Sequence, residues 1–538
     1  MSEKQHTEPI EDIYRTDYEI GQDNIHPFGL DLHNPVFVWS GGTAILFILF
    51  CGLFPDTAMA TLNGVKGWII NTFDWLFLSA GSIFVLFCLA LIVLPTGRIR
   101  LGGDDARPEY SRFSWFAMLF AAGMGIGLMY WSVAEPVGYF TEWAGSPLNI
   151  AGGTEEAKKA SLGALMYHWG LHPWGIYGVV ALTLAFFGYN KGMPMTVRTG
   201  FYPLLGDRVW GRTGNVIDTL ATIATLFGLA TSLGFGALQA AGGGSFLWGV
   251  PESLWVEVLI ITVVTGIALW SVLQGVDGGV KVLSNINMGI AGVLPLFVIF
   301  AGSVTGFIGN VGTTIAGYVE YILPLSNPVG RADTAFYHNW TIFYWAWWIS
   351  WSPFVGMFVA QVSKGRTIRE FLTAVLLVPT VVSIVWMAAF GGSGIDQAMQ
   401  GIGELTKGID DESLSLFHML ENMPLGMITS VVGIILALVF FVTSSDSGSL
   451  VVDTITAGGK TEAPPAQRVF WACAEGFVAA VLLLAGGAHA LGALQAAAIT
   501  TALPFVIVLL LMMVSLAMAL NRELKLRRQE AAAKVGAT

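Results

Sequence analysis

The chain has 538 residues, of which 54% are apolar and only 12% are charged, and its net charge at pH 7 is −11. Soluble proteins carry about 25% charged residues, and a single water-soluble core stops growing near about 250–300 residues. The composition therefore excludes an ordinary soluble enzyme, a nucleic-acid-binding protein and a disordered protein. It predicts an all-α protein that crosses a membrane several times. The three cysteines lie in apolar stretches, so we expect no disulfide framework and no CxxC metal site.

Long apolar runs recur along the whole chain. A helix needs about 20 mostly apolar residues to cross the hydrocarbon core of a membrane, and this rule predicts twelve transmembrane helices. The expected spans are 36–54, 74–95, 115–134, 162–188, 216–242, 254–273, 284–308, 336–361, 371–390, 425–445, 468–488 and 496–520. Residues 310–326 are amphipathic and are expected to lie along the membrane interface.

The basic residues predict the orientation. With both termini in the cytoplasm, the cytoplasmic segments hold all but five of the 26 Lys and Arg residues, those five being Lys66, Lys158, Lys159, Arg331 and Lys407. This bias places the chain in a bacterial-type cytoplasmic (inner) membrane with both termini inside. The acidic N-terminal tail and the basic C-terminal tail are either solvated or in contact, with each other or with anionic lipid headgroups.

Span 115–134 contains three glycines at alternate positions, Gly123, Gly125 and Gly127. Glycines weaken a helix, and unwound backbone at membrane depth can offer carbonyl oxygens to an ion where it lines a cavity. The alternative is close helix packing, because Gly123 and Gly127 also form a GxxxG pair. The absence of a surrounding βαβ pattern excludes a dinucleotide-binding loop.

Aromatic residues are concentrated in two spans. Five of the nineteen tryptophans lie between Trp340 and Trp351, whereas an aromatic belt would occupy the two ends of a helix. Residues three or four apart share a helix face, which groups Trp347, Trp348 and Trp351 in span 336–361, and Trp174 with Tyr177 in span 162–188, where Trp169 lies nearby. The alternative is packing of indoles in the core, and His168 and His172 are interpreted as packing residues.

Two aromatic clusters with no acidic residue among them suit a cation that cannot be hydrogen-bonded. A quaternary ammonium is such a group, and each aromatic face attracts it by roughly 0.5–2 kcal/mol. An ammonium with free N–H groups would leave its donors unsatisfied there. We therefore expect a methylated onium ligand.

Hydroxyl groups gather at the end of span 425–445, where Thr443 and Ser444 precede Ser445 and Asp446. Hydroxyl and carbonyl oxygens suit Na⁺, and carbonyls near Ala121 and Met124 could complete a site with Thr443 and Ser444. The alternative is a Ser/Asp cap at the start of a cytoplasmic helix, which would account for Asp446.

These motifs together resemble the betaine/choline/carnitine transporter family. The resemblance rests on Gly-Met-Gly-Ile-Gly at 123–127, Trp-Ala-Trp-Trp-Ile-Ser-Trp-Ser-Pro-Phe at 345–354 and Thr-Ser-Ser-Asp-Ser at 443–447, and it covers essentially the whole chain. It implies a LeuT-like core of two inverted five-helix repeats and a homotrimer. The expected units are an acidic tail at 1–35, two peripheral helices with a loop at 36–114, a first repeat at 115–308, an interfacial helix and loop at 309–335, a second repeat at 336–520 and a short basic tail at 521–538.

The resemblance also implies the binding residues. The substrate cage would consist of Trp169, Trp174, Tyr177, Trp347, Trp348 and Trp351. One sodium site would use Ala121, Met124, Phe440, Thr443 and Ser444. A second family sodium site is matched by Thr225 and Phe354, but Leu229 stands where the family has a second threonine, which is a departure from its usual form.

The resemblance also narrows the activity. Choline carriers of the family tend to have Asp where this chain has Gly127, which favours a zwitterion, and no Lys or Arg in spans 216–242 or 336–361 replaces the sodium ligands. We expect import of glycine betaine by sodium symport, with no cofactor beyond the coupling ion. The alternatives are carriage of carnitine, choline, dimethylsulfoniopropionate or trimethylamine N-oxide, sodium-independent exchange, and an onium-binding membrane sensor. No nucleophile–base pair indicates an enzyme.

Overall fold

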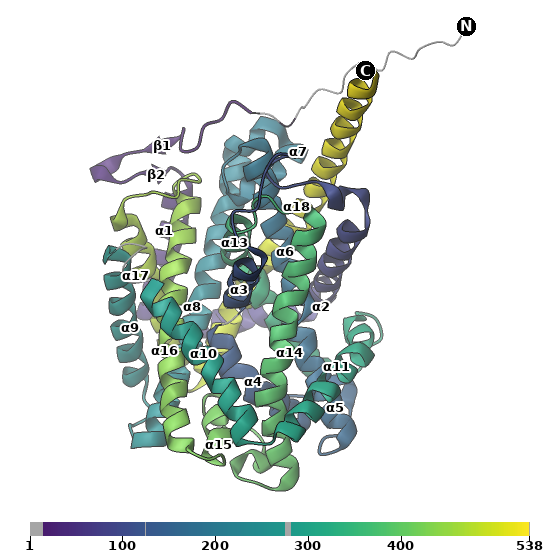
Figure 1. The fold of residues 1–538 in the computed structure, drawn as a ribbon. Coiled ribbons are helices and arrows are strands. Elements are labelled where there is room, and N and C mark those ends of the chain that lie inside the picture. Colours follow the sequence, from purple (N-terminus) through teal and green to yellow (C-terminus); the bar gives the residue numbers. More distant parts are fainter. Residues whose placement is uncertain (1–13, 15, 124, 275–280, 537–538) are drawn as a thin grey trace.

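The computed structural model describes residues 14, 16–123, 125–274 and 281–536. They form one body of helices, most of which run roughly alongside one another, with a two-stranded ribbon at one end (Figure 1). The ribbon pairs β1 (Asn24–Ile25) antiparallel with β2 (Leu32–His33). The ribbon and the end of the last helix lie at the same end of the molecule (Figure 1).

The helices follow one another with short connections. Those of the first half are α1 (Val36–Leu53), α2 (Pro55–Val93), α3 (Arg112–Gly123), α4 (Ile126–Phe140), α5 (Glu155–Trp169), α6 (Leu171–Ala185), α7 (Tyr202–Leu205), α8 (Arg212–Trp248) and α9 (Leu254–Gln274). Those of the second half are α10 (Lys281–Ala301), α11 (Val304–Ser326), α12 (Thr334–Phe336), α13 (Ile342–Gln361), α14 (Ile368–Gln400), α15 (Ser415–Glu421), α16 (Gly426–Thr456), α17 (Pro465–Gly486) and α18 (Ala490–Gly536).

Eight helices within the described residues are long and apolar enough to cross a membrane, or nine if α10 and α11, bent by 111°, count as one span. One of the eight, 465–532, covers two predicted spans. The predicted span 115–134 is divided between α3 and α4, and the Trp-rich span 336–361 is less apolar. The count of twelve therefore stays a prediction, while a multi-pass membrane protein follows directly.

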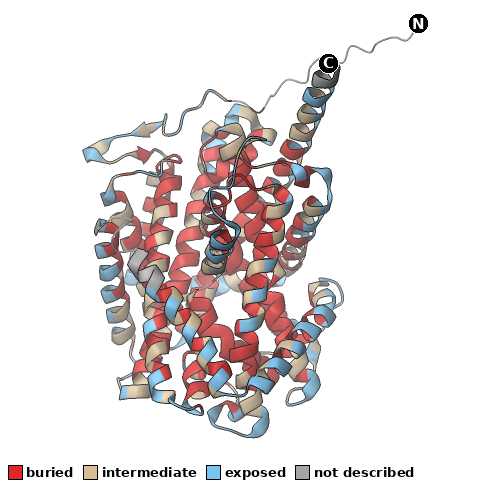
Figure 2. Ribbon diagram, in the orientation of Figure 1, coloured by how far each residue is buried: buried red, intermediate tan, exposed pale blue. Residues whose placement is uncertain are grey.

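Outer and inner helices differ in burial. Only 28% of the most apolar stretch of α1 and of α9 is buried, against 94% in the stretch that contains α5 and α6. Figure 2 shows the same contrast between pale-blue outer helices and red inner ones. Large apolar side chains such as Trp255 and Phe300 are exposed by 75% and 71%. An apolar outer surface of this extent suits contact with lipid.

Two helices extend well beyond the predicted spans. Helix α2 begins at Pro55 rather than near residue 74 and has 39 residues, about 58 Å at 1.5 Å per residue, because no helix breaker interrupts its polar first half. Helix α18 continues through the expected C-terminal tail for 47 residues. Its last turns are rich in good helix formers and carry an Arg527–Glu523 pair at 2.9 Å.

The segment 16–35, which we call the N-terminal strap, joins loops that are far apart in the sequence. Asp31 Oδ2 accepts a hydrogen bond from Lys460 Nζ at 2.6 Å, in the loop between α16 and α17. His33 lies 3.4 Å from Arg198 Nη1, in the connection between α6 and α8, and Arg198 pairs with the buried Asp218. Burial, together with the Arg198 charge, lowers the pKa of His33 to about 4.

Candidate functional site: an aromatic cavity beside a broken helix

The glycine-rich segment lies where one helix ends and another begins. Helix α3 ends at Gly123, Gly125 has extended backbone, and α4 begins at Ile126. Met124 is outside the described residues. Gly127 lies within α4, and a Cβ atom there would come within 2.5 Å of Trp347 and 2.8 Å of Trp169. Gly127 thus allows α4 to approach the indoles closely.

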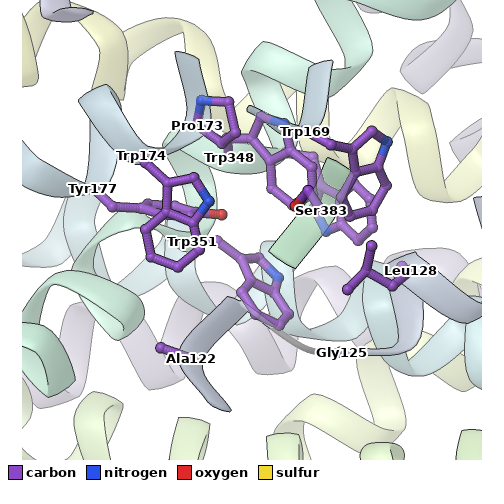
Figure 3. Close-up of a pocket in the computed structure, with 12 residues that line it drawn as sticks. Ala122, Gly125, Leu128, Trp169, Pro173, Trp174, Tyr177, Trp348, Trp351 and Ser383 are labelled. Carbon is purple, nitrogen blue, oxygen red and sulfur yellow. The ribbon is translucent and has the colours of Figure 1, made fainter. Parts of the chain in front are cut away.

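The six aromatic residues predicted for the cage line one cavity of about 470 Å³ (Figure 3). They are Trp169 from α5, Trp174 and Tyr177 from α6, and Trp347, Trp348 and Trp351 from α13. The rings of Trp347 and Trp348 are stacked at 4.5 Å, and Trp169 meets Trp348 edge-on at 4.9 Å. The rest of the wall is mostly small or apolar: Ala122, Gly125, Gly127, Leu128, Pro173 and Ser383.

The indole N–H groups of the three α13 tryptophans are hydrogen-bonded to other helices. The bonds run from Trp347 Nε1 to Ser232 Oγ at 3.1 Å, from Trp348 Nε1 to the His168 carbonyl at 2.9 Å and from Trp351 Nε1 to the Gly228 carbonyl at 2.9 Å. Each bond fixes a ring by its polar edge. The apolar faces and edges of these rings remain as wall of the cavity.

A buried carboxylate, Glu135 of α4, stands behind the cage, so the expectation of no acidic residue among the aromatics is wrong. Its Oε2 accepts from Trp169 Nε1 at 2.8 Å and from the Tyr344 hydroxyl at 2.5 Å. Its Oε1 accepts from the Tyr139 hydroxyl at 2.6 Å and lies 2.8 Å from His168 Nδ1. Glu135 is fully buried and supports the cage from outside its wall.

Two further residues were not foreseen from the sequence in their observed roles. Ser383 of α14 places its side chain at the cavity, but a single serine in an apolar helix gives no signal. His168 is more than a packing residue, because its Nε2 also lies 2.9 Å from Thr341 Oγ1. Glu135 had a signal, since an acid beside an apolar span often marks a functional site, but the predicted span ended one residue before it.

A second cavity, of about 770 Å³, adjoins the first and shares Ala122 and Trp351 with it. It is lined by four of the residues predicted for the first sodium site, Ala121, Phe440, Thr443 and Ser444, and by Phe354. The Thr443 hydroxyl donates to the Val439 carbonyl at 3.0 Å, which leaves its oxygen lone pairs available to a cation.

The residues predicted for a second sodium site are not brought together in either cavity. Phe354 lines the second cavity, whereas Thr225 lines neither and its hydroxyl donates to the Ala221 carbonyl at 2.8 Å. Leu229 packs against Gly448 of α16, where an added Cβ would come within 2.4 Å of the leucine. Asp446 is not a helix cap, because α16 continues without interruption to Thr456.

An apolar helical body with a ligand-sized cavity beside an interrupted helix at its centre is the architecture of a membrane transporter. The chain belongs to the betaine/carnitine/choline transporter family, because the sequence model of that family matches residues 35–525. Its relatives are transporters rather than enzymes, and we conclude that this chain is not an enzyme.

Individual relatives match over nearly their whole length. Glycine betaine transporter 1 of Vibrio parahaemolyticus is 59% identical over 95% of this chain and 98% of its own. A glycine betaine/proline/choline/ectoine transporter of the same organism is 53% identical over 96% and 92%. The glycine betaine transporter OpuD of Bacillus subtilis is 41% identical over 88% and 92%.

Proposed function

We propose that the protein is a secondary active transporter that imports glycine betaine, or a closely similar methylated zwitterion, by sodium symport. The observation that carries the proposal is the aromatic cavity next to the start of α4. This arrangement offers separate surroundings for the two charges of a zwitterion.

The aromatic walls suit the onium group. Each ring face attracts a quaternary ammonium by roughly 0.5–2 kcal/mol, and such a group has no N–H donors that need acceptors. Glu135 does not line the cavity, and its oxygens already accept hydrogen bonds from the surrounding side chains. The onium group is therefore bound by rings rather than by an ion pair.

The carboxylate would lie at the start of α4. The first N–H groups of a helix have no partner within it, and its dipole places about half a positive charge there. Gly125 and Gly127 both line the cavity, so this end of α4 is accessible without an intervening side chain. Ser383 adds a hydroxyl on the opposite helix, α14.

Sodium would bind in the second cavity, to carbonyl oxygens near Ala121 and Met124 and to oxygens of Phe440, Thr443 and Ser444. An ion there would link α16 to the end of α3 and so stabilise the break on which the substrate site depends. Alternating access would then follow from rocking of two five-helix repeats about the cavities, with both termini in the cytoplasm of a bacterial-type cell. A homotrimer and contact of the basic tail with lipid headgroups complete the proposal.

Uptake by proteoliposomes tests transport. With an imposed inward sodium gradient, radiolabelled betaine should accumulate, and accumulation should stop when potassium replaces sodium. Binding without accumulation would support an onium sensor instead, and accumulation that ignores sodium would support exchange. Carnitine, choline, dimethylsulfoniopropionate and trimethylamine N-oxide, added as competitors, would establish the substrate range.

The Trp348→Leu variant tests the cage. It removes a ring that stacks on Trp347 and should abolish saturable betaine binding. Trp255→Leu is the matched control, because Trp255 is 75% exposed on α9, and it should bind like the parent protein. Near-parental affinity of Trp348→Leu would refute the cage assignment.

A further inference from the structure

Two carboxylates are buried between α9, α16 and α17, away from both cavities. Glu475 lies near the middle of α17 and is fully buried, and Asp446 on α16 is 7% exposed. All three helices are apolar enough to span a membrane. Ionisable side chains at such positions are costly and usually serve a function.

Hydroxyl groups accompany both carboxylates, but cations do not. Ser445 Oγ donates to Glu475 Oε2 at 3.1 Å, and Ser271 Oγ of α9 donates to Asp446 Oδ2 at 2.9 Å. Within the described part of the chain, neither carboxylate forms an ion pair. Arg468, the basic residue of α17, instead lies 3.7 Å from Asp453. The negative charge is therefore not balanced by any described side chain.

Two buried oxygen atoms at this junction have no hydrogen-bond partner in the structure: Glu475 Oε1 and Thr265 Oγ1. The Thr265 hydroxyl of α9 lies against α17 right next to Glu475, because a Cβ on Gly476 would come within 2.6 Å of it. Thr262 donates to the carbonyl four residues earlier, as threonines in helices commonly do, whereas Thr265 does not. A free hydroxyl and a free carboxylate oxygen thus belong to one polar cluster.

A proton on Glu475 would not satisfy this cluster. Carried by Oε1, it would become a buried donor without an acceptor, which is unfavourable. No hydrogen bond joins the carboxyl groups of Asp446 and Glu475, so they do not share a proton. A bound cation, by contrast, balances the charge and gives both unpartnered oxygens a ligand role, and carboxylate and hydroxyl oxygens are the ligands that hard cations prefer.

We propose that Asp446 and Glu475, with the hydroxyls of Thr265, Ser271 and Ser445, form an alkali-cation site between α9, α16 and α17. The site goes beyond the transport activity proposed above and does not depend on it. Asp446 lies two residues beyond Ser444, or about 200° around α16. The new site therefore lies on the face of α16 opposite to the cavity-facing hydroxyls.

Equilibrium binding of ²²Na⁺ to the purified full-length protein tests the site. We expect Glu475→Gln to bind one sodium ion fewer per chain than the parent, and excess potassium will show how selective the site is. Thr443→Ala is the matched control on the cavity side of α16, and it should keep the sodium ion that Glu475→Gln loses.

The outcomes separate the two sodium proposals. An unchanged number of bound ions in folded Glu475→Gln would overturn the new site, whatever happens to the pH dependence of binding. Unchanged binding in Thr443→Ala would count against the cavity-side site alone. If Glu475→Gln does not fold, Ser271→Ala provides the test, because loss of a group that orients a ligand typically lowers metal affinity about 10–100-fold. Parental affinity in Ser271→Ala would then overturn the proposal.

Discussion

Glu135 should act on substrate affinity through the hydrogen bond that it accepts from Trp169, rather than through its charge. Two substitutions separate these roles. Glu135→Leu removes every acceptor, whereas Glu135→Gln removes the charge and keeps one oxygen. That oxygen can face Trp169 and Tyr344 while the amide group faces Tyr139 and His168, both of which can accept a hydrogen bond.

The structure gives the expected magnitudes. In Glu135→Leu, the Trp169 N–H and the Tyr344 hydroxyl both lose their acceptor, and each buried unpaired donor costs about 1–3 kcal/mol. The sum, about 2–6 kcal/mol, exceeds the roughly 0.5–2 kcal/mol that one ring contributes to binding an onium group. Trp169 should therefore rotate towards water in the cavity and leave the cage, and betaine affinity should fall about 2- to 30-fold.

The assay is betaine binding followed by tryptophan fluorescence, with the KM for uptake measured in parallel. Glu135→Gln should stay within about twofold of the parent, because its two essential hydrogen bonds persist. Glu404→Leu, a substitution at an exposed position outside the cavity, is the control. If Glu135→Gln were as defective as Glu135→Leu, the charge would be the important property; parental affinity in Glu135→Leu would show that the hydrogen bonds are irrelevant.

Three other predictions concern different parts of the molecule. Gly127→Ala places a Cβ 2.5 Å from Trp347, and a cost of about 1–3 kcal/mol from overpacking should raise the KM for betaine uptake about tenfold or more, while an unchanged KM would contradict the close approach. Because the pKa of His33 is about 4 in the folded protein and about 6.5 unfolded, the unfolded chain binds more protons between these values; the free energy of unfolding should fall by about 2 kcal/mol from pH 7 to pH 5, and melting curves should show that His33→Gln loses this dependence. Arg198→Met leaves the buried Asp218 without its partner and should reduce the free energy of unfolding by about 3–5 kcal/mol, a loss that Asp218→Asn in the same chain should partly restore; a melting temperature equal to the parent's would refute the role of this pair.

Most helices were predictable from apolar runs, and their ends were not. Span 254–273 was expected, and α9 runs from Leu254 to Gln274, because both ends coincide with a change to polar composition. At α2 and α18 the apolar run stops before the helix does. Hydropathy reports which residues enter lipid, whereas a helix continues until a glycine, a proline or a competing contact ends it.

The candidate site was predictable where residues of one kind were dense, and not where single residues mattered. The aromatic residues of α6 and α13 could be grouped by their three- and four-residue spacing. Glu135 and Ser383 belong to no pattern, and only tertiary contacts from other helices give them a role. Asp446 was misinterpreted as a cap because Ser271, its partner, lies 175 residues away in the sequence.

The bonds that hold the indole N–H groups have a consequence for the entropy of ligand binding. Ordering a flexible side chain at a binding surface costs about 0.5–1.5 kcal/mol, and an aromatic cage of loose rings would bear this cost several times. Here Trp169 is fixed by a carboxylate, and Trp347, Trp348 and Trp351 are fixed by a hydroxyl and two carbonyls. The rings are ordered during folding instead. Weak individual attractions can then add up to useful affinity for a ligand that forms few hydrogen bonds.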